Sequence, residues 1–319
     1  HRDLHLSLRR QRQMCIRDRY NDHVFIVSEA AGHGMQVFDL SQLRGLDSKQ
    51  NFTADYTYSG YGQAHNIAIN TETGYAYTAG AGVAGNGRPG FGIHALNIAD
   101  PTSPVLELQL PDHGYTHDAQ IVNYKGPDSD HFGKEIYIGS NETKVVIVDV
   151  TDKNNPQLIS QFYYDDEYTH QSWLTEDHRY ALLGDELDEL DQSTQPWTLK
   201  DDVETRTIVI DISDLDNPIL HFNYLSDTEA IDHNGYVVGS KFYLASYTSG
   251  MRVIDIINIQ QKSFTEVGFF DTHIDDDHHH NNADETSPPY GDPGDHTGKK
   301  GQEIEAFNGA WSVLSLIHI

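Results

Sequence analysis

The sequence predicts an all-β fold, a β-propeller built from four-stranded antiparallel blades. Short runs rich in Val, Ile, Tyr and Phe are bounded by Gly, Asn, Asp and Pro, as strands usually are. No segment keeps an amphipathic helical period for three turns. One sequence unit also recurs along the chain, and the spacing of its copies is close to that of propeller blades.

The recurring unit is an apolar run that ends in Asp or Asn and leads into a polar turn, as in VVIVDVTDKNNP. Its copies lie 44 to 62 residues apart, slightly more than the period of about 40–50 residues in known propeller blades. In three copies a proline lies seven residues after the Asp or Asn. We expect this side chain to accept backbone N–H bonds in the turn between the third and fourth strands. The Asp and Asn positions are Asp39, Asn97, Asp149, Asp211 and Asp255.

The expected strands group into blades. Residues 23–58 contain three, so the first blade is expected to be partial, and a sixth begins at 307–313 and is cut off. About five blades are therefore present, of six or seven expected in the complete protein. A β-sandwich is the alternative, but it would not repeat the unit at blade intervals. The strands of the complete blades are expected at 66–69, 75–79, 92–98 and 105–110; 119–124, 135–139, 144–150 and 158–164; 171–174, 180–184, 207–212 and 219–224; and 235–238, 242–246, 251–256 and 264–269.

Composition narrows the possible partners. The 319 residues carry a net charge of -28, which argues against nucleic acid because a polyanion would be repelled. The same charge favours cations as ligands. No run of 18 apolar residues occurs, so we expect no transmembrane segment.

The two ends do not follow the repeat. Residues 13–19 (QMCIRDR) and 314–319 (LSLIHI) look like translated sequencing-adapter read-through. We expect residues 1–19 and 314–319 to be non-native tails flanking an incomplete propeller at 20–313, and the natural protein to be truncated at both ends. The only cysteine, Cys15, lies in the first tail, and a cysteine-free body suits an exported protein.

A histidine opens the first strand of each complete blade, and a carboxylate follows the end of several second strands. In a propeller the first strand is innermost, and the second strand returns to the same rim. Imidazoles and carboxylates are therefore expected to converge near the axis, where they could bind iron, zinc, manganese or calcium. The candidate metal ligands are His65, His117, His170, His233, Glu29, Glu142 and Glu186, with Asp185 and Tyr247 beside them.

Other roles for the four histidines stay open. WD-type propellers carry a structural histidine near this point of each blade, and histidines also transfer protons. Long loops at 79–92, 187–204 and 272–305 lie on the histidine rim by strand counting, which favours that rim as the working face. The first loop lacks a phosphate-binding motif, and the third fits either a solvated acidic loop or a cation site without an EF-hand pattern.

The segment VVIVDVTDKNNP resembles the LVIVD repeat. The wider set SEAAGHGMQVFDL, HNIAIN, YTHDAQIV, YALLGDELDE, ASYTSGMRVIDI and FNGAWSV resembles, in the same order, the choice-of-anchor B family of bacterial surface proteins. The resemblance covers residues 22–313. It implies an exported propeller held at the cell surface by one of several C-terminal anchors. The resemblance does not assign a catalytic role to any residue.

Three functions fit these observations. The first is an exported, cell-surface ligand-binding or adhesion module that holds an unknown surface or extracellular ligand on its loop-rich histidine face. The second is a metal-dependent enzyme with a divalent ion on the propeller axis. The third is a purely structural surface-layer component. Only the arrangement of the histidines distinguishes among them, because fold alone does not fix function.

Overall fold

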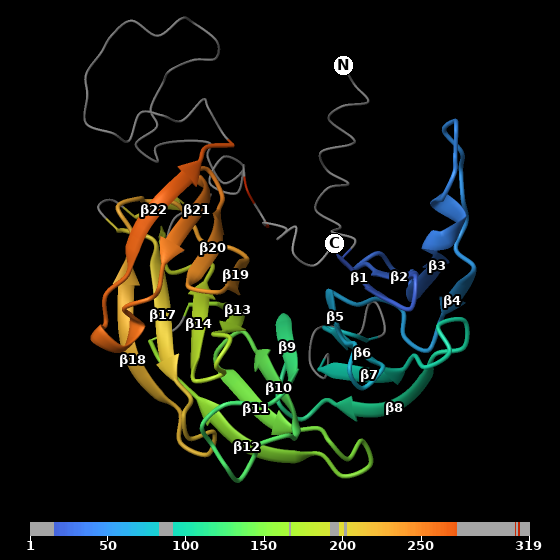
Figure 1. Cartoon of the computed structure of the whole chain (residues 1–319), viewed down its shortest axis with the longest axis horizontal. Helices are drawn as coiled ribbons and strands as arrows, with labels where there is room; N and C mark the ends of the chain where they lie inside the picture. The colour runs from blue at the N-terminus through green and yellow to red at the C-terminus, as the bar shows by residue number, and fades with distance from the viewer. Residues whose placement is uncertain are drawn as a thin grey trace, which may run out of the picture. The chain divides into compact units, whose positions relative to one another are not determined.

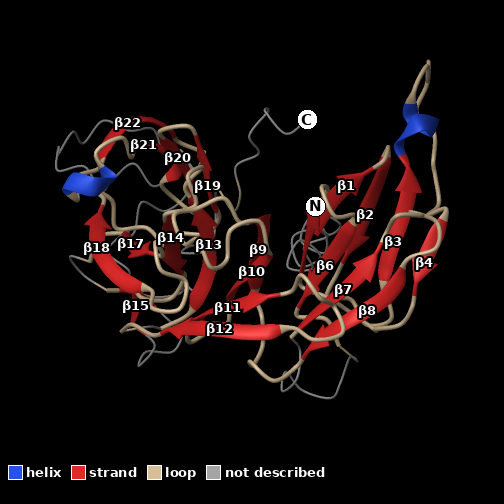
Figure 2. Ribbon diagram, turned by 60° about the horizontal axis from the view of Figure 1, so that its bottom comes forward, coloured by secondary structure: helices blue, strands red, loops and turns tan. Residues whose placement is uncertain are grey.

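Five four-stranded antiparallel sheets make up the computed structural model of this chain (Figure 1). The structure describes residues 16–82, 92–165, 167–191, 198–200, 203–272, 310 and 312. Strands dominate these residues (Figure 2), and the only helices among them are two short 3-10 turns, η1 (Leu40–Leu43) and η2 (Ile259–Gln261). In this part of the chain no helix is long and apolar enough to cross a membrane. The predicted all-β, propeller-like fold is confirmed.

Each sheet is formed by strands in chain order, and a two-stranded hairpin is inserted into the fourth sheet. The first two sheets are β1 (Ile16–Tyr20), β2 (His23–Val27), β3 (Met35–Asp39) and β4 (Tyr56–Tyr58), then β5 (Asn66–Asn70), β6 (Tyr75–Ala79), β7 (Ile93–Asn97) and β8 (Val105–Leu110). The third is β9 (Asp118–Asn123), β10 (Glu135–Ser140), β11 (Val145–Asp149) and β12 (Gln157–Phe162). The last two are β13 (Thr169–Leu174), β14 (Tyr180–Asp185), β17 (Arg206–Asp211) and β18 (Ile219–Leu225), then β19 (Gly235–Val238), β20 (Lys241–Ser246), β21 (Gly250–Asp255) and β22 (Thr265–Phe270). The inserted hairpin is β15 (Leu190–Asp191) with β16 (Thr198–Leu199).

The chain forms two compact units, residues 1–125 with 129–161, and residues 126–128 with 162–319. The first unit holds the first three sheets, and the second holds the fourth and fifth. Within each unit, neighbouring sheets bury their apolar faces against one another. This is the packing that a propeller blade needs, because a lone four-stranded sheet leaves one apolar face exposed to water.

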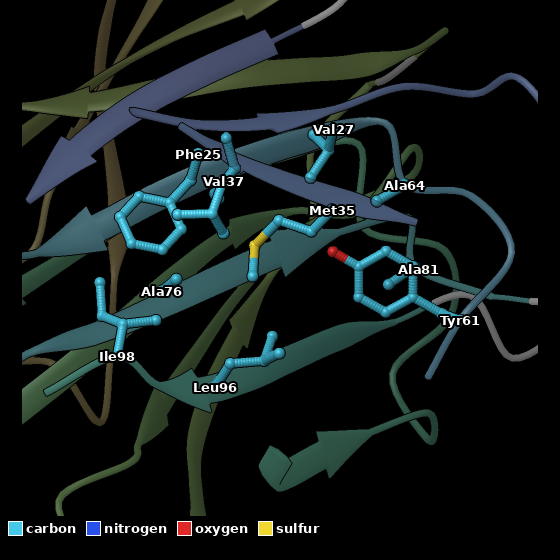
Figure 3. Close-up of a cluster of buried hydrophobic side chains, with 11 residues drawn as sticks. Phe25, Val27, Met35, Val37, Tyr61, Ala64, Ala76, Ala81, Leu96 and Ile98 are labelled. Atoms are coloured by element: carbon cyan, nitrogen blue, oxygen red, sulfur yellow. The ribbon is translucent and has the colours of Figure 1, made fainter. Parts of the chain in front are cut away.

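The core between the first two sheets illustrates this packing (Figure 3). Phe25 and Met35 of the first sheet meet Ala76 and Leu96 of the second, and all four side chains are fully buried. Strand alternation produces this arrangement, since residues 25 and 27 of β2 point inward while their neighbours are partly exposed. Full burial of a Phe or Met side chain stabilises the fold by about 1.5–3 kcal/mol.

The repeated Asp or Asn plays the predicted structural role in all five copies. In each, Oδ1 accepts a hydrogen bond from the backbone N–H two residues later, at distances between 2.8 and 3.1 Å. For Asp211, burial opposes ionisation, but the bonds from Ser213 and the charge of Arg179 lower its pKa overall. The unit is therefore an Asx turn that fixes the exit of the third strand.

The N-terminal boundary predicted from sequence is wrong. Residues 16–19 were placed in a tail outside the fold, yet they form most of β1 and pair with β2 in a register from Ile16 opposite Val27 to Tyr20 opposite His23. Asp18 also accepts a hydrogen bond from the backbone N–H of Ile69, 2.7 Å away. The segment IRDR has little apolar character in sequence, and its strand is defined by the backbone pairing with β2. The first blade is thus complete. Residues 1–15 and 314–319 lie outside the described residues, as does most of the expected sixth blade.

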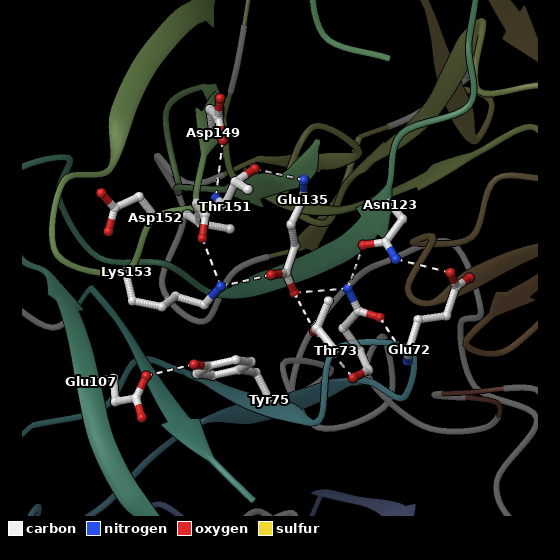
Figure 4. Close-up of polar contacts among 12 residues, drawn as sticks. Glu72, Thr73, Tyr75, Glu107, Asn123, Glu135, Asp149, Thr151, Asp152 and Lys153 are labelled. Atoms are coloured by element: carbon white, nitrogen blue, oxygen red, sulfur yellow. Dashed lines mark hydrogen bonds and ion pairs between the residues drawn. The ribbon is translucent and has the colours of Figure 1, made fainter. Parts of the chain in front are cut away.

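A buried ion pair within the third sheet is linked by hydrogen bonds to the second sheet of the first unit (Figure 4). The Lys153 ammonium lies 2.7 Å from Oε2 of Glu135, and both side chains are less than a tenth exposed. Oε1 of Glu135 accepts hydrogen bonds from Asn70 and Thr73, and Lys153 also donates to the carbonyl of Val150. The partners that a buried ion pair needs are therefore present.

Candidate metal centre

Each of the four histidines lies where the first strand of its sheet begins. His65 and His117 immediately precede β5 and β9, His170 is the second residue of β13, and His233 lies two residues before β19. The carboxylates lie just after second strands. Glu29 and Glu142 follow β2 and β10 by two residues, and Glu186 directly follows β14. The strand registration predicted from sequence is therefore correct in each sheet.

In the second unit, two of these histidines share one carboxylate. His170 Nε2 lies 3.7 Å from Oε2 of Glu186, and His233 Nε2 lies 3.8 Å from Oε1. The two imidazole rings have centroids 4.1 Å apart. Among the described residues, these three side chains are not a group whose ligand atoms all lie within 4.8 Å of one another. Because both imidazoles approach this one carboxylate, we call the three side chains the Glu186 cluster.

The separations in this cluster suit a shared ion better than direct hydrogen bonds. Both exceed the usual N···O hydrogen-bond range of about 2.7–3.2 Å. Two ligand atoms that each lie about 2.0–2.2 Å from one zinc ion are at most about 4.4 Å apart, and each of the two N···O distances falls inside that limit. Binding of one ion by all three side chains would therefore require a small side-chain rotation.

The surrounding fold holds the cluster in place. The strand pair β13–β14 has a bulge between Thr169 and Gln171, which places His170 at the irregular position, and its side chain is only 1% exposed. The amide oxygen of Gln171 accepts a 2.7 Å hydrogen bond from the backbone N–H of Gly235, joining the starts of β13 and β19. Bulges often re-aim a side chain at a functional position.

Glu186 itself is oriented by Tyr247, which lies at the end of β20. The Tyr247 hydroxyl donates a 2.6 Å hydrogen bond to Oε1 of Glu186. Burial, followed by the charge of Glu186, raises the pKa of this phenol, so it stays a donor at neutral pH. The ring of His233 meets Tyr247 edge to face. Contacts of this kind, made to a ligand residue rather than to the ion, commonly fix the orientation of metal ligands.

The first unit holds a different arrangement. His65 Nδ1 lies 2.9 Å from Oε1 of Glu29, which is a direct hydrogen bond. The ring of His117 lies beside that of His65, with centroids 4.0 Å apart. Gly80, at a φ of +60°, leaves room here, because a Cβ on it would lie 2.9 Å from the Cβ of His65. Glu29 therefore bonds directly to the His65 imidazole and orients it. Glu186, in contrast, lies at longer distances from its two imidazoles.

Glu142 stands apart among the predicted ligands. It occupies a left-handed backbone position (φ 56°) in the turn after β10 and is half-buried. Among the described residues, it belongs to no group of three ligating side chains that could hold one ion.

Sequence reasoning named Asp185 but missed three further buried carboxyl groups, those of Asp188, Glu189 and Asp232, next to the Glu186 cluster. Asp185, Glu189 and Asp232 are each at most 1% exposed, and Asp188 is 10% exposed. Asp185 accepts hydrogen bonds from the Tyr164 hydroxyl and two backbone N–H groups. A sequence signal was available, because Asp232 precedes its histidine where the other blades have Ala64, Thr116 and Thr169.

Electrostatics separates these carboxyl groups from ordinary surface acids. Burial raises the pKa of Asp232 well above its usual value; Asp188 and Asp185 raise it further, and Arg206 opposes them. Burial likewise raises the pKa of Glu189, with Asp232 and Asp188 as the nearest charges. Arg206 Nε lies 2.5 Å from Oδ2 of Asp188 and supplies part of the compensating charge.

Two of the long loops named as part of the working face lie mainly outside the described residues. These are the glycine-rich segment, from residue 83 to 91, and the acidic segment beyond residue 272. The third, at 187–204, is partly described and contains the β15–β16 hairpin, which begins directly after Glu189.

The fold and these clusters define a propeller-like protein with candidate metal-binding groups. No protein-family model and no curated protein sequence matches the chain. Among solved structures, it is similar to a functionally unknown protein from Desulfotomaculum acetoxidans, with a TM-score of 0.55 and 10% identity over 81% of this chain and 71% of the other. It is also similar to a protein from Lactobacillus plantarum, with a TM-score of 0.51 and 13% identity over 79% and 70%. At these identities the likeness concerns the fold alone.

Proposed function

We propose that this protein is a divalent-metal-dependent ligand-binding module of the bacterial cell surface. The observation that carries the proposal is the Glu186 carboxylate facing both His170 Nε2 and His233 Nε2. Two imidazoles and one carboxylate suit zinc, iron or manganese, and they leave further coordination positions for an oxygen-containing ligand.

The cellular setting of this proposal rests on the sequence. The motifs from SEAAGHGMQVFDL to FNGAWSV resemble the choice-of-anchor B family, and VVIVDVTDKNNP resembles the LVIVD repeat. Such proteins are exported and surface-anchored, which agrees with a strongly acidic chain that has one cysteine. An acidic exterior also concentrates divalent cations near the rim.

The test is metal binding by the chain purified without a histidine tag and stripped with a chelator. Elemental analysis and calorimetry with zinc, iron and manganese should show near-stoichiometric binding. His170→Ala and His233→Ala should each weaken binding at least tenfold, whereas His23→Ala, at the start of β2 and not a member of the Glu186 cluster, should leave it unchanged. If the unsubstituted protein takes up no metal, or if the two variants bind as tightly as it does, the Glu186 cluster is structural.

A second candidate function, a metal-dependent enzyme, is favoured by the composition of the cluster. Two histidines and one carboxylate also form the ligand set of many non-haem iron oxygenases and of some zinc hydrolases. A catalytic centre needs an open coordination position, while a purely structural site is closed. Cobalt-substituted protein should therefore change its visible spectrum on addition of azide. An unchanged spectrum would exclude the open site that an enzyme requires.

A further inference from the structure

Behind the Glu186 cluster lies a set of carboxylate oxygens without hydrogen-bond partners. In the part of the chain that the structure describes, both oxygens of Asp232 are buried and unpartnered. Oδ1 of Asp188 and Oε2 of Glu189 are buried without a donor from any other residue, and these two carboxyl groups interact with each other. Asp232 is 1% exposed, so bulk solvent does not reach these oxygens. Buried polar atoms are nearly always satisfied in folded proteins, and several orphans on neighbouring side chains indicate a missing ligand.

The cations near these carboxylates compensate for their negative charge only in part. The Arg206 guanidinium donates to Oδ2 of Asp188 and to the backbone carbonyl of Asp165, and its backbone N–H donates to Oε1 of Glu189. The Lys200 ammonium lies 2.7 Å from the backbone carbonyl of Asp188. Asp232 therefore stays without a direct positive partner, although isolated buried carboxylates are strongly disfavoured.

We infer that Asp188, Glu189 and Asp232 bind a hard divalent cation of the calcium class. Carboxylate oxygens are the ligands that calcium prefers, and this set contains no imidazole or thiolate that would select zinc or iron. Asp188 and Glu189 come from the connection after β14, and Asp232 precedes β19. The ion would thus join the fourth sheet to the fifth within the second unit. This inference does not depend on the proposed function, because it uses other residues and another class of metal.

The packing around Asp232 agrees with a built site. A Cβ placed on Gly184 would lie 2.5 Å from Oδ2 of Asp232, so only glycine allows β14 to approach the carboxylate this closely. Among the described residues, the three carboxylates are not yet a group whose ligand atoms all lie within 4.8 Å of one another. Because calcium–oxygen distances are about 2.3–2.6 Å, binding must draw them closer by side-chain rotation.

The experiment measures calcium binding to the full chain after chelator treatment, by calorimetry and by thermal unfolding. Calcium should bind near one equivalent and raise the unfolding temperature, by roughly 5 °C at saturation. Asp232→Asn and Glu189→Gln, which keep side-chain shape, should abolish both effects. His170→Ala should keep calcium binding while losing zinc, so this inference and the proposed function can fail separately.

Two outcomes would overturn the inference. One is a stripped protein that neither binds calcium nor changes its unfolding temperature up to millimolar calcium; the carboxyl groups would then share protons. The other is calcium binding that is unchanged in both variants, which would place the ion elsewhere. If Asp232→Asn does not fold by circular dichroism, Glu189→Gln alone decides.

Discussion

The hydroxyl of Tyr247 donates a 2.6 Å hydrogen bond to Oε1 of Glu186, across 61 positions of sequence. This bond joins the end of β20 to the end of β14 and fixes the carboxylate that faces His170 and His233. A residue that does not touch the proposed ion therefore controls the geometry of its ligands.

Tyr247→Phe should weaken metal binding without unfolding the protein. Loss of the hydroxyl frees Glu186 to rotate, and removing such outer contacts typically lowers metal affinity about 10- to 100-fold. Calorimetry with zinc or manganese measures the change. Tyr243→Phe, on the same strand, is the matched control and should bind normally. Equal affinity in the two variants would mean that the Tyr247 bond does not position the carboxylate.

Asp211→Ala should reduce stability while leaving metal binding intact. The Asp211 side chain accepts a 2.9 Å bond from the Ser213 backbone N–H, and Arg179 lies 3.3 Å from its other oxygen. Loss of the turn bond should lower the free energy of unfolding by about 1 kcal/mol, measured in urea. Asp211→Asn keeps an acceptor oxygen, so its free energy of unfolding should fall by less than that of Asp211→Ala. A variant of normal stability with impaired binding would contradict a structural role for the turn.

Breaking the buried ion pair of Glu135 and Lys153 should lower the free energy of unfolding more than Asp211→Ala does. Lys153→Met leaves the Glu135 carboxylate buried without its cation, which typically costs about 3–5 kcal/mol. Lys125, whose ion pair with Glu72 is exposed, provides the control. Lys125→Met should change the free energy of unfolding by less than about 1 kcal/mol. The same urea series measures both variants, and similar losses in the two would contradict the role of burial.

His94 should make stability depend on pH in the acidic range. Burial lowers the pKa of His94 to about 4. Between the unfolded value of about 6.5 and pH 4, the unfolded chain binds a proton that the folded protein refuses. The stabilisation that comes from keeping His94 neutral is therefore fully present above pH 6.5. It is lost as the pH falls, and the free energy of unfolding drops by roughly 3 kcal/mol over the full range.

Comparison of unfolding at pH 7.5 and pH 4.5 with that of His94→Gln checks this prediction. The variant should lose less stability on acidification than the unsubstituted protein. Other groups titrate in both proteins, so only the difference between them counts. If both lose the same amount, His94 does not titrate as its burial implies.

Much of the local structure could be predicted from the sequence alone. Strand alternation and the repeated Asx turn depend on residues only a few positions apart in sequence. The hydrogen bonds that Asp149 and Asp211 accept from the turn backbone could therefore be predicted. The same logic placed the histidines at the starts of inner strands. It failed at residues 16–19, because these residues show no apolar alternation in sequence, while in the structure their backbone pairs with β2.

Tertiary structure alone decided which of these side chains meet. Sequence placed Glu29 and Glu186 in equivalent positions, yet one bonds directly to His65 and the other faces two imidazoles at longer distances. Nor could the spacing in sequence show that Asp232 is buried beside Asp188 and Glu189, since they come from different sheets. The physical reason is that a strand repeat fixes position along each blade, whereas distances between side chains depend on how neighbouring blades pack.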